Sequence, residues 1–155
     1  MTRTAAREIA IQICYASLIS GTPVDEVTDA LFAPEYFATL SEENELFRTK
    51  PEEKQLDYIR NLTSQTAAHM DELNAFIEKY AHGWKVDRIS KVAASILRCA
   101  MTEILYVEEV PVSVTVNEAV ELAKGYEEPE TVSFIYGILG SFVRTEIECA
   151  VPESE

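Results

Sequence analysis

Apolar residues recur every three to four positions along most of this chain, which is the period of helices that bury one face. The pattern is clearest between residues 86 and 142. Its first part predicts a helix from the apolar positions Ile89, Val92, Ile96, Ala100 and Ile104. Pro111 forbids continuation, because proline lacks an N–H and keeps the preceding residue out of the helical region. Two more helices are predicted after it, from Val116, Ala119, Val120 and Ala123 and then from Phe134, Ile135, Ile138, Leu139 and Phe142.

The same period predicts helices in the first third of the chain. An apolar stripe marks a first helix over roughly 4–20, which Gly21 ends as a helix C-terminal glycine. Thr22 and Pro23 are typical of the N-cap and first position of a short second helix over about 23–31. Residues 33–48 have weak periodicity, so they are predicted to form a long connection with at most one turn of helix.

A longer helical stripe follows and runs to about residue 80. Thr49 and Glu52 fit a capping box at its start. Because the stripe is long for one helix, a kink or break is predicted near residues 63–69. Towards the end of the chain, Pro129 separates the last two helices, and Thr131 is predicted to be the N-cap of the second of them.

These patterns predict an all-α protein, since no stretch shows the sustained period-two alternation of a strand. We expect one helical domain over residues 1–148. Within it, an N-terminal bundle covers about 1–80 and a C-terminal bundle about 84–148. Residues 149–155 are expected to be a disordered acidic tail.

Composition narrows the class of protein. The 155 residues, 47% of them apolar, suffice for one domain with a core. No uncharged apolar run approaches the ~20 residues of a membrane span, and the N-terminus lacks the apolar region of a secretory signal. The three cysteines are scattered and form no C-x-x-C. They are typical of reduced thiols, so a cytoplasmic location is expected.

The net charge of −14 is unevenly distributed. Residues 102–155 hold twelve acidic and two basic residues, and this acidity is interpreted mainly as solvated helix faces. Residues 1–19 and 61–101 are nearly neutral. The second of these stretches contains five basic residues, Lys79, Lys85, Arg88, Lys91 and Arg98.

Catalytic patterns are absent from the sequence. It contains no Gly-rich phosphate loop, no H-E-x-x-H and no G-x-S-x-G. Neither His69 nor His82 follows a glutamate by three positions, as the histidines of helical di-metal sites do. We therefore expect no enzymatic activity, no cofactor and no metal.

Several segments carry a family resemblance in their order, spacing and identity. They are Ile96-Leu97-Arg98-Cys99-Ala100, Val110-Pro111, the run Asn117-Glu118-Ala119-Val120-Glu121-Leu122-Ala123-Lys124, and Phe134-Ile135 followed by Gly137-Ile138-Leu139. Ala6-Arg7-Glu8 fits at the N-terminus. Over about 1–20 and 56–142 the chain resembles the NusB family of bacterial transcription antitermination factors. The resemblance implies about seven helices in two small packed bundles.

The resemblance also implies a function without catalysis. Family members bind the boxA element of ribosomal RNA leader transcripts together with the ribosomal protein NusE. That complex helps RNA polymerase read through terminators in ribosomal RNA operons. The same expectations therefore apply to this chain, and the resemblance further implies that a homodimer can form.

Four residues match family positions at or near the RNA. Arg3 and Arg7 begin the first helix, where a guanidinium could grip phosphate, although a solvated helix start explains them equally well. Phe134 could stack on an unpaired base, but its spacing from Ile135 and Ile138 favours core packing. Glu130 sits just before that last helix, and without the resemblance it is simply a charged turn residue.

Two residues match family positions that contact NusE. Tyr15 is the first, and it could equally be a half-buried tyrosine. Ala93 stands where the family often carries an acidic residue, so it cannot meet a basic group of NusE. Tyr136 also departs from the family, which usually has asparagine there.

Two rival functions stay open beside antitermination. One is an acidic helical adaptor that keeps the fold but binds protein and little RNA, which the sparse arginines favour. The other is an enzyme, because NusB-like domains occur fused to ribosomal RNA methyltransferases. That second reading needs a Gly-rich cofactor loop, and this sequence has none.

Overall fold

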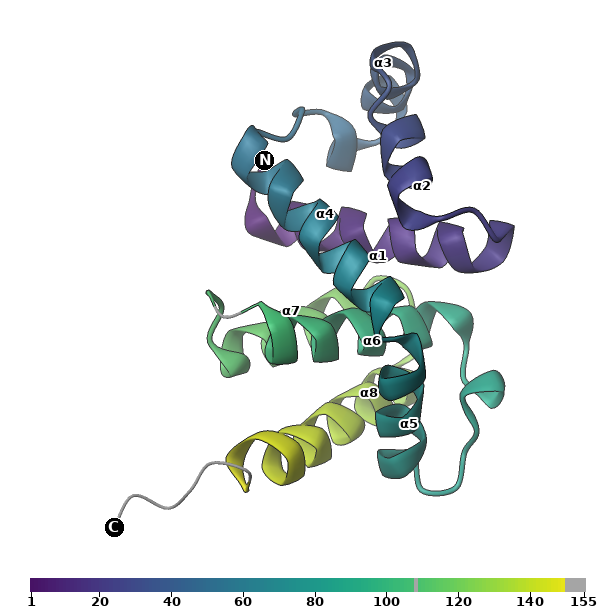
Figure 1. Ribbon diagram of the computed structural model, residues 1–155, viewed down its shortest axis with the longest axis vertical. Coiled ribbons are helices and arrows are strands. Elements are labelled where there is room, and N and C mark those ends of the chain that lie inside the picture. The colour runs from purple at the N-terminus through teal and green to yellow at the C-terminus, as the bar shows by residue number, and fades with distance from the viewer. Residues whose placement is uncertain (108, 150–155) are drawn as a thin grey trace. The chain divides into compact units, whose positions relative to one another are not determined.

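The computed structural model describes residues 1–107 and 109–149, and these contain helices and no strand (Figure 1). The all-α prediction is confirmed, with eight α-helices in the described residues where about seven were expected. The chain divides into two compact units, Met1–Ala68 and His69–Glu155. Apart from Cys149, the expected acidic tail lies outside the described residues. No helix in the described part of the chain is long and apolar enough to cross a membrane.

Unit 1 begins with α1 (Arg3–Ser20), close to the predicted bounds. The Thr2 hydroxyl caps its first turn by accepting a hydrogen bond from the Ala5 N–H. Gly21 ends the helix as predicted, with φ 76° and its N–H donating to the Ser17 carbonyl. Glycine suits this left-handed position because it has no Cβ to clash.

α2 (Val24–Leu31) starts differently from the prediction, because its N-cap is Pro23 and no side chain caps it. The predicted Thr22 cap is therefore wrong. Thr22 instead joins α1 to α2, since its carbonyl accepts a hydrogen bond from the Ser17 hydroxyl at 2.6 Å.

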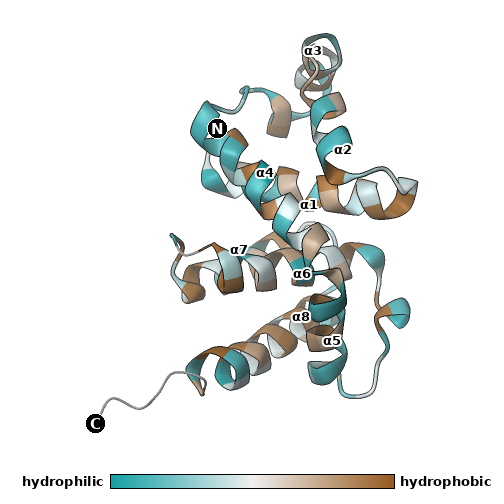
Figure 2. Ribbon diagram, viewed as in Figure 1, coloured by the Kyte–Doolittle hydropathy of each residue, from teal (hydrophilic) through white to brown (hydrophobic). Residues whose placement is uncertain are grey.

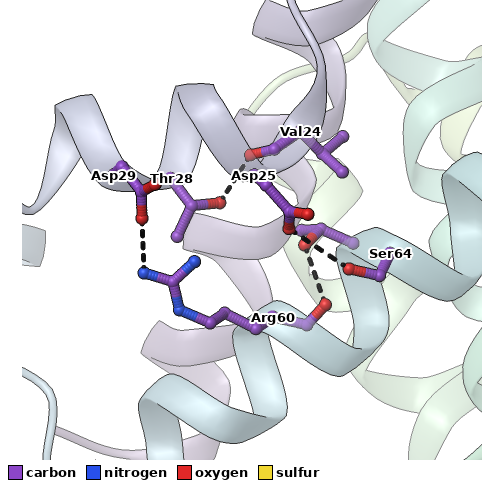
Figure 3. Close-up of polar contacts among 7 residues, drawn as sticks. Val24, Asp25, Thr28, Asp29, Arg60 and Ser64 are labelled. Atoms are coloured by element: carbon purple, nitrogen blue, oxygen red, sulfur yellow. Dashed lines mark hydrogen bonds and ion pairs between the residues drawn. The ribbon is translucent and has the colours of Figure 1, made fainter.

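Two polar contacts join α2 to α4 (Glu53–Ala68) (Figure 3). Arg60 Nη2 lies 2.7 Å from Asp29 Oδ1, and the Ser64 hydroxyl lies 3.4 Å from Asp25 Oδ1. Both contacts are exposed, so they align the helices and contribute little stability.

The predicted connection over residues 33–48 is wrong, because the segment forms α3 (Pro34–Glu43) and the 3₁₀ turn η1 (Glu45–Phe47). Proline at the first helical position favours the start of α3. Phe37 then contacts two other rings, Phe32 at 5.6 Å and Phe47 at 6.2 Å between centroids. Such tertiary packing stabilises a helix whose own apolar period is weak.

α4 begins at Glu53, so the capping box predicted from Thr49 and Glu52 is not formed. The helix packs against α1. Their shared core consists of fully buried apolar residues, Ala6, Ile9, Ala10, Ile13, Ile59 and Leu62. Burying each of the larger side chains contributes about 1.5–3 kcal/mol, so this pair of helices is the centre of unit 1.

Unit 2 begins with α5 (Met70–Tyr80), which confirms the break predicted near 63–69. The 3₁₀ turn η2 (Val86–Arg88) leads to α6 (Lys91–Tyr106), and α7 (Val112–Lys124) follows Pro111 as expected. α8 (Pro129–Phe142) continues into the π-helical turn η3 (Val143–Glu148). The N-cap of α8 is Glu128, so the prediction of Thr131 as cap is wrong. Proline at the first helical position sets the start three residues earlier.

The core of unit 2 forms around α6, which contacts α5, α7 and α8. Figure 2 shows hydrophobic residues along α8, of which Ile135, Ile138, Leu139 and Phe142 are buried. Buried polar groups are paired, as such groups must be. Arg98 Nε donates to Asn74 Oδ1 at 2.8 Å, and the Thr115 hydroxyl donates to the Glu103 carboxylate.

Candidate nucleic-acid interface

A pocket of about 270 Å³ opens on unit 2 where η2, the start of α6 and the first turns of α8 meet. Its lining combines two aromatic rings, a guanidinium, a carboxylate and two hydroxyls. The lining residues are Trp84, Arg88, Ile89, Ser90, Glu130, Thr131 and Phe134. Two of them, Glu130 and Phe134, belong to the predicted RNA-binding set.

The turn after α5 presents Trp84 to this pocket. His82 and Gly83 both have left-handed backbone conformations, with φ 49° and 91°. The Trp84 N–H donates to the Ala81 carbonyl at 3.2 Å and closes the turn. As a result the indole is 56% exposed, although a tryptophan side chain usually buries most of its surface.

Phe134 forms the second aromatic wall. Its ring centroid lies 6.4 Å from that of Trp84, with an angle of 64° between the ring planes. On α8 the neighbouring Ile135 and Ile138 are buried, whereas Phe134 is only half-buried. The helical spacing therefore places Phe134 at the edge of the core, where part of its ring stays accessible.

Two charged residues line the pocket together with the rings. Arg88 ends η2, and Glu130 lies in the first turn of α8, where the helix dipole favours a carboxylate. Within residues 1–107 and 109–149, neither side chain is hydrogen-bonded or ion-paired with another residue. Both are therefore available to a ligand.

Ser90 belongs to the pocket lining and makes two hydrogen bonds. Its Oγ caps α6 by accepting a hydrogen bond from the Ala93 N–H at 3.0 Å, and its O–H donates to Glu127 Oε1 at 2.6 Å. On the other side, the Val86 N–H donates to Glu78 Oε2 at 3.0 Å. The first pair of bonds ties the start of α6 to the α7–α8 loop, and the last ties η2 to α5.

The two predicted arginines lie in unit 1 and are occupied by packing. The Arg3 guanidinium carbon lies 3.9 Å above the Tyr58 ring, and Arg3 Nε donates to Gln55 Oε1 at 3.2 Å. Arg7 is only 4% exposed, with its guanidinium 5.9 Å from the same ring. The structure therefore groups Arg3 with Arg7, and Glu130 with Phe134, as two separate pairs in different units.

The predicted partner-binding residues differ in accessibility. Tyr15 is partly exposed on α1 and shares its face with Leu18 and Ile19, which are also exposed. Their spacing makes a short apolar stripe near the end of the helix. Ala93 is 0% exposed in α6, so its methyl group offers no surface to a partner.

Trp84 and Arg88 are the residues that sequence reasoning missed. Trp84 lies in the Ala81–Trp84 segment that interrupts the helical period, and Arg88 is one of the five basic residues of the nearly neutral stretch 61–101. A lone tryptophan at a glycine turn, close to several of these basic residues, was the available signal. In the described residues, no group of three or more His, Cys, Asp or Glu side chains could hold a metal ion.

Comparison with solved structures defines the class of fold. A NusB structure from T. maritima superposes with a TM-score of 0.77 at 20% identity, covering 94% of this chain and 92% of that one. A structure of antitermination factors NusB and NusE with double-stranded RNA gives 0.72, covering 92% and 96%. At these identities the match shows the fold alone, a NusB-like pair of helical bundles.

Sequence comparison then gives the family. The NusB family model matches residues 4–144. The transcription antitermination protein NusB of Symbiobacterium thermophilum is 39% identical, covering 93% of this chain and 90% of that protein. Its counterpart in Alkaliphilus oremlandii is 34% identical, covering 94% and 96%. This chain belongs to the NusB family.

Proposed function

We propose that this protein is a transcription antitermination factor that binds boxA-type leader RNA together with NusE and supports read-through by RNA polymerase in ribosomal RNA operons. The observation that carries the proposal is the match to NusB over nearly the whole chain, with relatives named as transcription antitermination proteins. The role needs no catalytic group. It also puts the protein in the cytoplasm, where bacterial transcription takes place.

The pocket of unit 2 supports a role in binding single-stranded RNA. Proteins that recognise single-stranded RNA sequence-specifically stack its unpaired bases on aromatic side chains. They also form hydrogen bonds to the edges of these bases. Phe134 and Glu130 supply one group of each kind at the same pocket. Double-stranded RNA would not use these groups, because its bases are already stacked and paired.

RNA binding by the isolated chain should be weak. The net charge is −14, and each phosphate neutralised on a single strand changes the salt slope by only about 0.7. Arg7 is buried, which leaves Arg3 as the more accessible of the two predicted phosphate contacts. A basic partner such as NusE would supply the missing positive charge.

The surface for NusE is proposed at the exposed stripe of α1 that contains Tyr15, Leu18 and Ile19. Tyrosine suits such an interface, because its ring packs while its hydroxyl finds a polar partner. Ala93 itself is buried, so we propose that NusE contacts the surface of α6 around it and not its methyl group. A homodimer could use the same stripe and would then compete with NusE.

The test is a titration of labelled boxA RNA followed by fluorescence anisotropy, with and without NusE. We expect weak binding alone and a sharp rise in affinity with NusE. Tyr15→Ala should reduce that rise, whereas Tyr36→Ala, at an exposed tyrosine of α3, should not. A transcription assay on a template with boxA and a terminator measures read-through directly.

The adaptor alternative has one observation in its favour, the burial of Arg7. It predicts that this protein binds NusE with the same affinity whether or not boxA RNA is present. It also predicts that the complex binds boxA RNA no more tightly than NusE alone does. That result, together with no gain in read-through, would replace the antitermination proposal by a role in binding protein only.

A further inference from the structure

We propose that the pocket of unit 2 holds one unpaired guanine of the bound RNA, stacked on Trp84 and selected by Arg88 and Glu130. The inference rests on the proposed function, because it assumes that RNA reaches unit 2. It adds Trp84 and Arg88, which carry no predicted role, and it names the base that the pocket prefers.

The aromatic geometry fits one base. Trp84 has the largest aromatic face in the chain and is more than half exposed, although exposing an indole to water is unfavourable. Its ring plane meets that of Phe134 at 64°, so the two rings form a corner. A base that stacks on the indole would meet the Phe134 ring with its edge.

The size of the pocket limits the occupant. About 270 Å³ lies just below the ~300–1,000 Å³ of sites for drug-sized ligands. A single planar heterocycle fits within such a volume. We place the next nucleotides of the strand outside the pocket.

Two lysines next to lining residues in the sequence carry charge that suits a phosphate backbone. Lys85 follows Trp84 and Lys91 follows Ser90, and both are exposed, with Asp87 as an acidic residue between them. Lysine contributes to phosphate binding as a point charge and needs no fixed geometry. The strand would pass over these lysines while its base turns inward.

The polar groups favour guanine over the other bases. A guanidinium makes two parallel hydrogen bonds to guanine O6 and N7. A carboxylate accepts two from the guanine N1–H and exocyclic amine, a donor pair that adenine, cytosine and uracil do not offer. Arg88 and Glu130 line the same pocket and are not committed to other described residues.

The pocket is preorganised for this ligand. The turn at His82 and Gly83 and the hydrogen bond from Ser90 to Glu127 hold its walls in place without RNA. Preorganisation lowers the entropic cost of binding, so a single base can contribute measurably.

The experiment uses Trp84 as its own probe, because it is the only tryptophan in the sequence. The full chain with NusE is titrated with boxA RNA and with oligouridines that carry one G, A or C at the centre. Stacking should quench the Trp84 fluorescence, most strongly and at the lowest concentration with G. Equal quenching by all oligonucleotides would overturn the selection of guanine.

Variants separate stacking from selection. Trp84→Ala should weaken RNA binding on the order of ten- to a hundredfold, and Trp84→Phe should recover part of the loss. Glu130→Gln should reduce the preference for G over A, measured as the ratio of the two dissociation constants. Glu128→Gln, at an exposed residue outside the pocket lining, is the matched control and should change neither.

The results also distinguish a failure of this inference from a failure of the proposed function on which it rests. If anisotropy shows that the complex binds boxA RNA while Trp84 fluorescence and the Trp84→Ala affinity stay unchanged, the pocket inference is overturned and the function stands. If no boxA RNA binds with NusE present, the proposed function fails, and the inference fails with it.

Discussion

The start of α1 and the pocket of unit 2 carry the same predicted role, but their side chains have different surroundings. Arg3 and Arg7 pack against Tyr58, whereas Trp84 and Phe134 face an open pocket with an uncommitted guanidinium beside them. A residue of the right chemical type can contribute to binding only if folding leaves it available. On that criterion the pocket is the stronger of the two sites.

The largest expected effect concerns folding and sharpens this comparison. Arg7→Ala should lower the free energy of unfolding by about 1.5–3 kcal/mol, because it removes a buried charged group and its contacts. Urea unfolding followed by circular dichroism measures the change. Arg48→Ala, at a well exposed arginine of the same unit, is the control and should stay within about 0.5 kcal/mol. A stable Arg7→Ala protein with lost RNA binding would reverse the ranking of the two sites.

The next effect concerns RNA. Phe134→Ala should weaken binding of boxA RNA to the complex with NusE by about 1–3 kcal/mol, because one wall of the pocket is lost. Tyr136→Ala is the matched control, since Tyr136 lies on the same helix, is exposed and does not line the pocket. Anisotropy titrations at one fixed salt concentration measure both. If only the control variant lost affinity, the site would lie elsewhere on α8.

A smaller effect is expected at the first arginine. Arg3→Ala should reduce the slope of log affinity against log salt by about 0.7, the value for one phosphate on a single strand. Arg3→Lys keeps the charge and should preserve the slope. An unchanged slope in Arg3→Ala would mean that the guanidinium stays on Tyr58 when RNA binds.

The smallest effect lies outside both sites, at the ion pair between α5 and η3. Hydrogen bonds from Lys79 Nζ, at 2.6 Å, and from the Tyr80 hydroxyl lower the pKa of Glu146. The same contact raises the pKa of Lys79. Because the carboxyl pKa is depressed in the folded state, its contribution to stability is present above the unfolded pKa of about 4.3 and is lost as pH falls through the folded value.

Glu146→Gln should therefore be slightly less stable than the native chain at neutral pH, with the difference closing in acid. The Lys79 contribution disappears at the other extreme, as pH rises through its raised pKa. Urea unfolding at several pH values tests this, with Glu148→Gln as an exposed control. RNA affinity should be the same in both variants, and a loss in either would show that binding extends to η3.

Local sequence signals predicted much of the secondary structure. The apolar period of α6, α7 and α8 and the glycine at the end of α1 depend only on residues close in the sequence. They can therefore be recognised without knowledge of the tertiary structure. Residues 33–48 escaped prediction, because contacts among Phe32, Phe37 and Phe47 stabilise α3 more than its own pattern does.

The sequence by itself determined the all-α class, most helix boundaries and the family to which the chain belongs. Only the tertiary structure decided which candidate side chains are available. It buried Arg7, left Phe134 half-open and brought Trp84 and Arg88 to the same pocket as Glu130. Helices follow from periodicity over neighbouring residues, whereas burial and pockets depend on which distant segments pack together, and no local pattern encodes that choice.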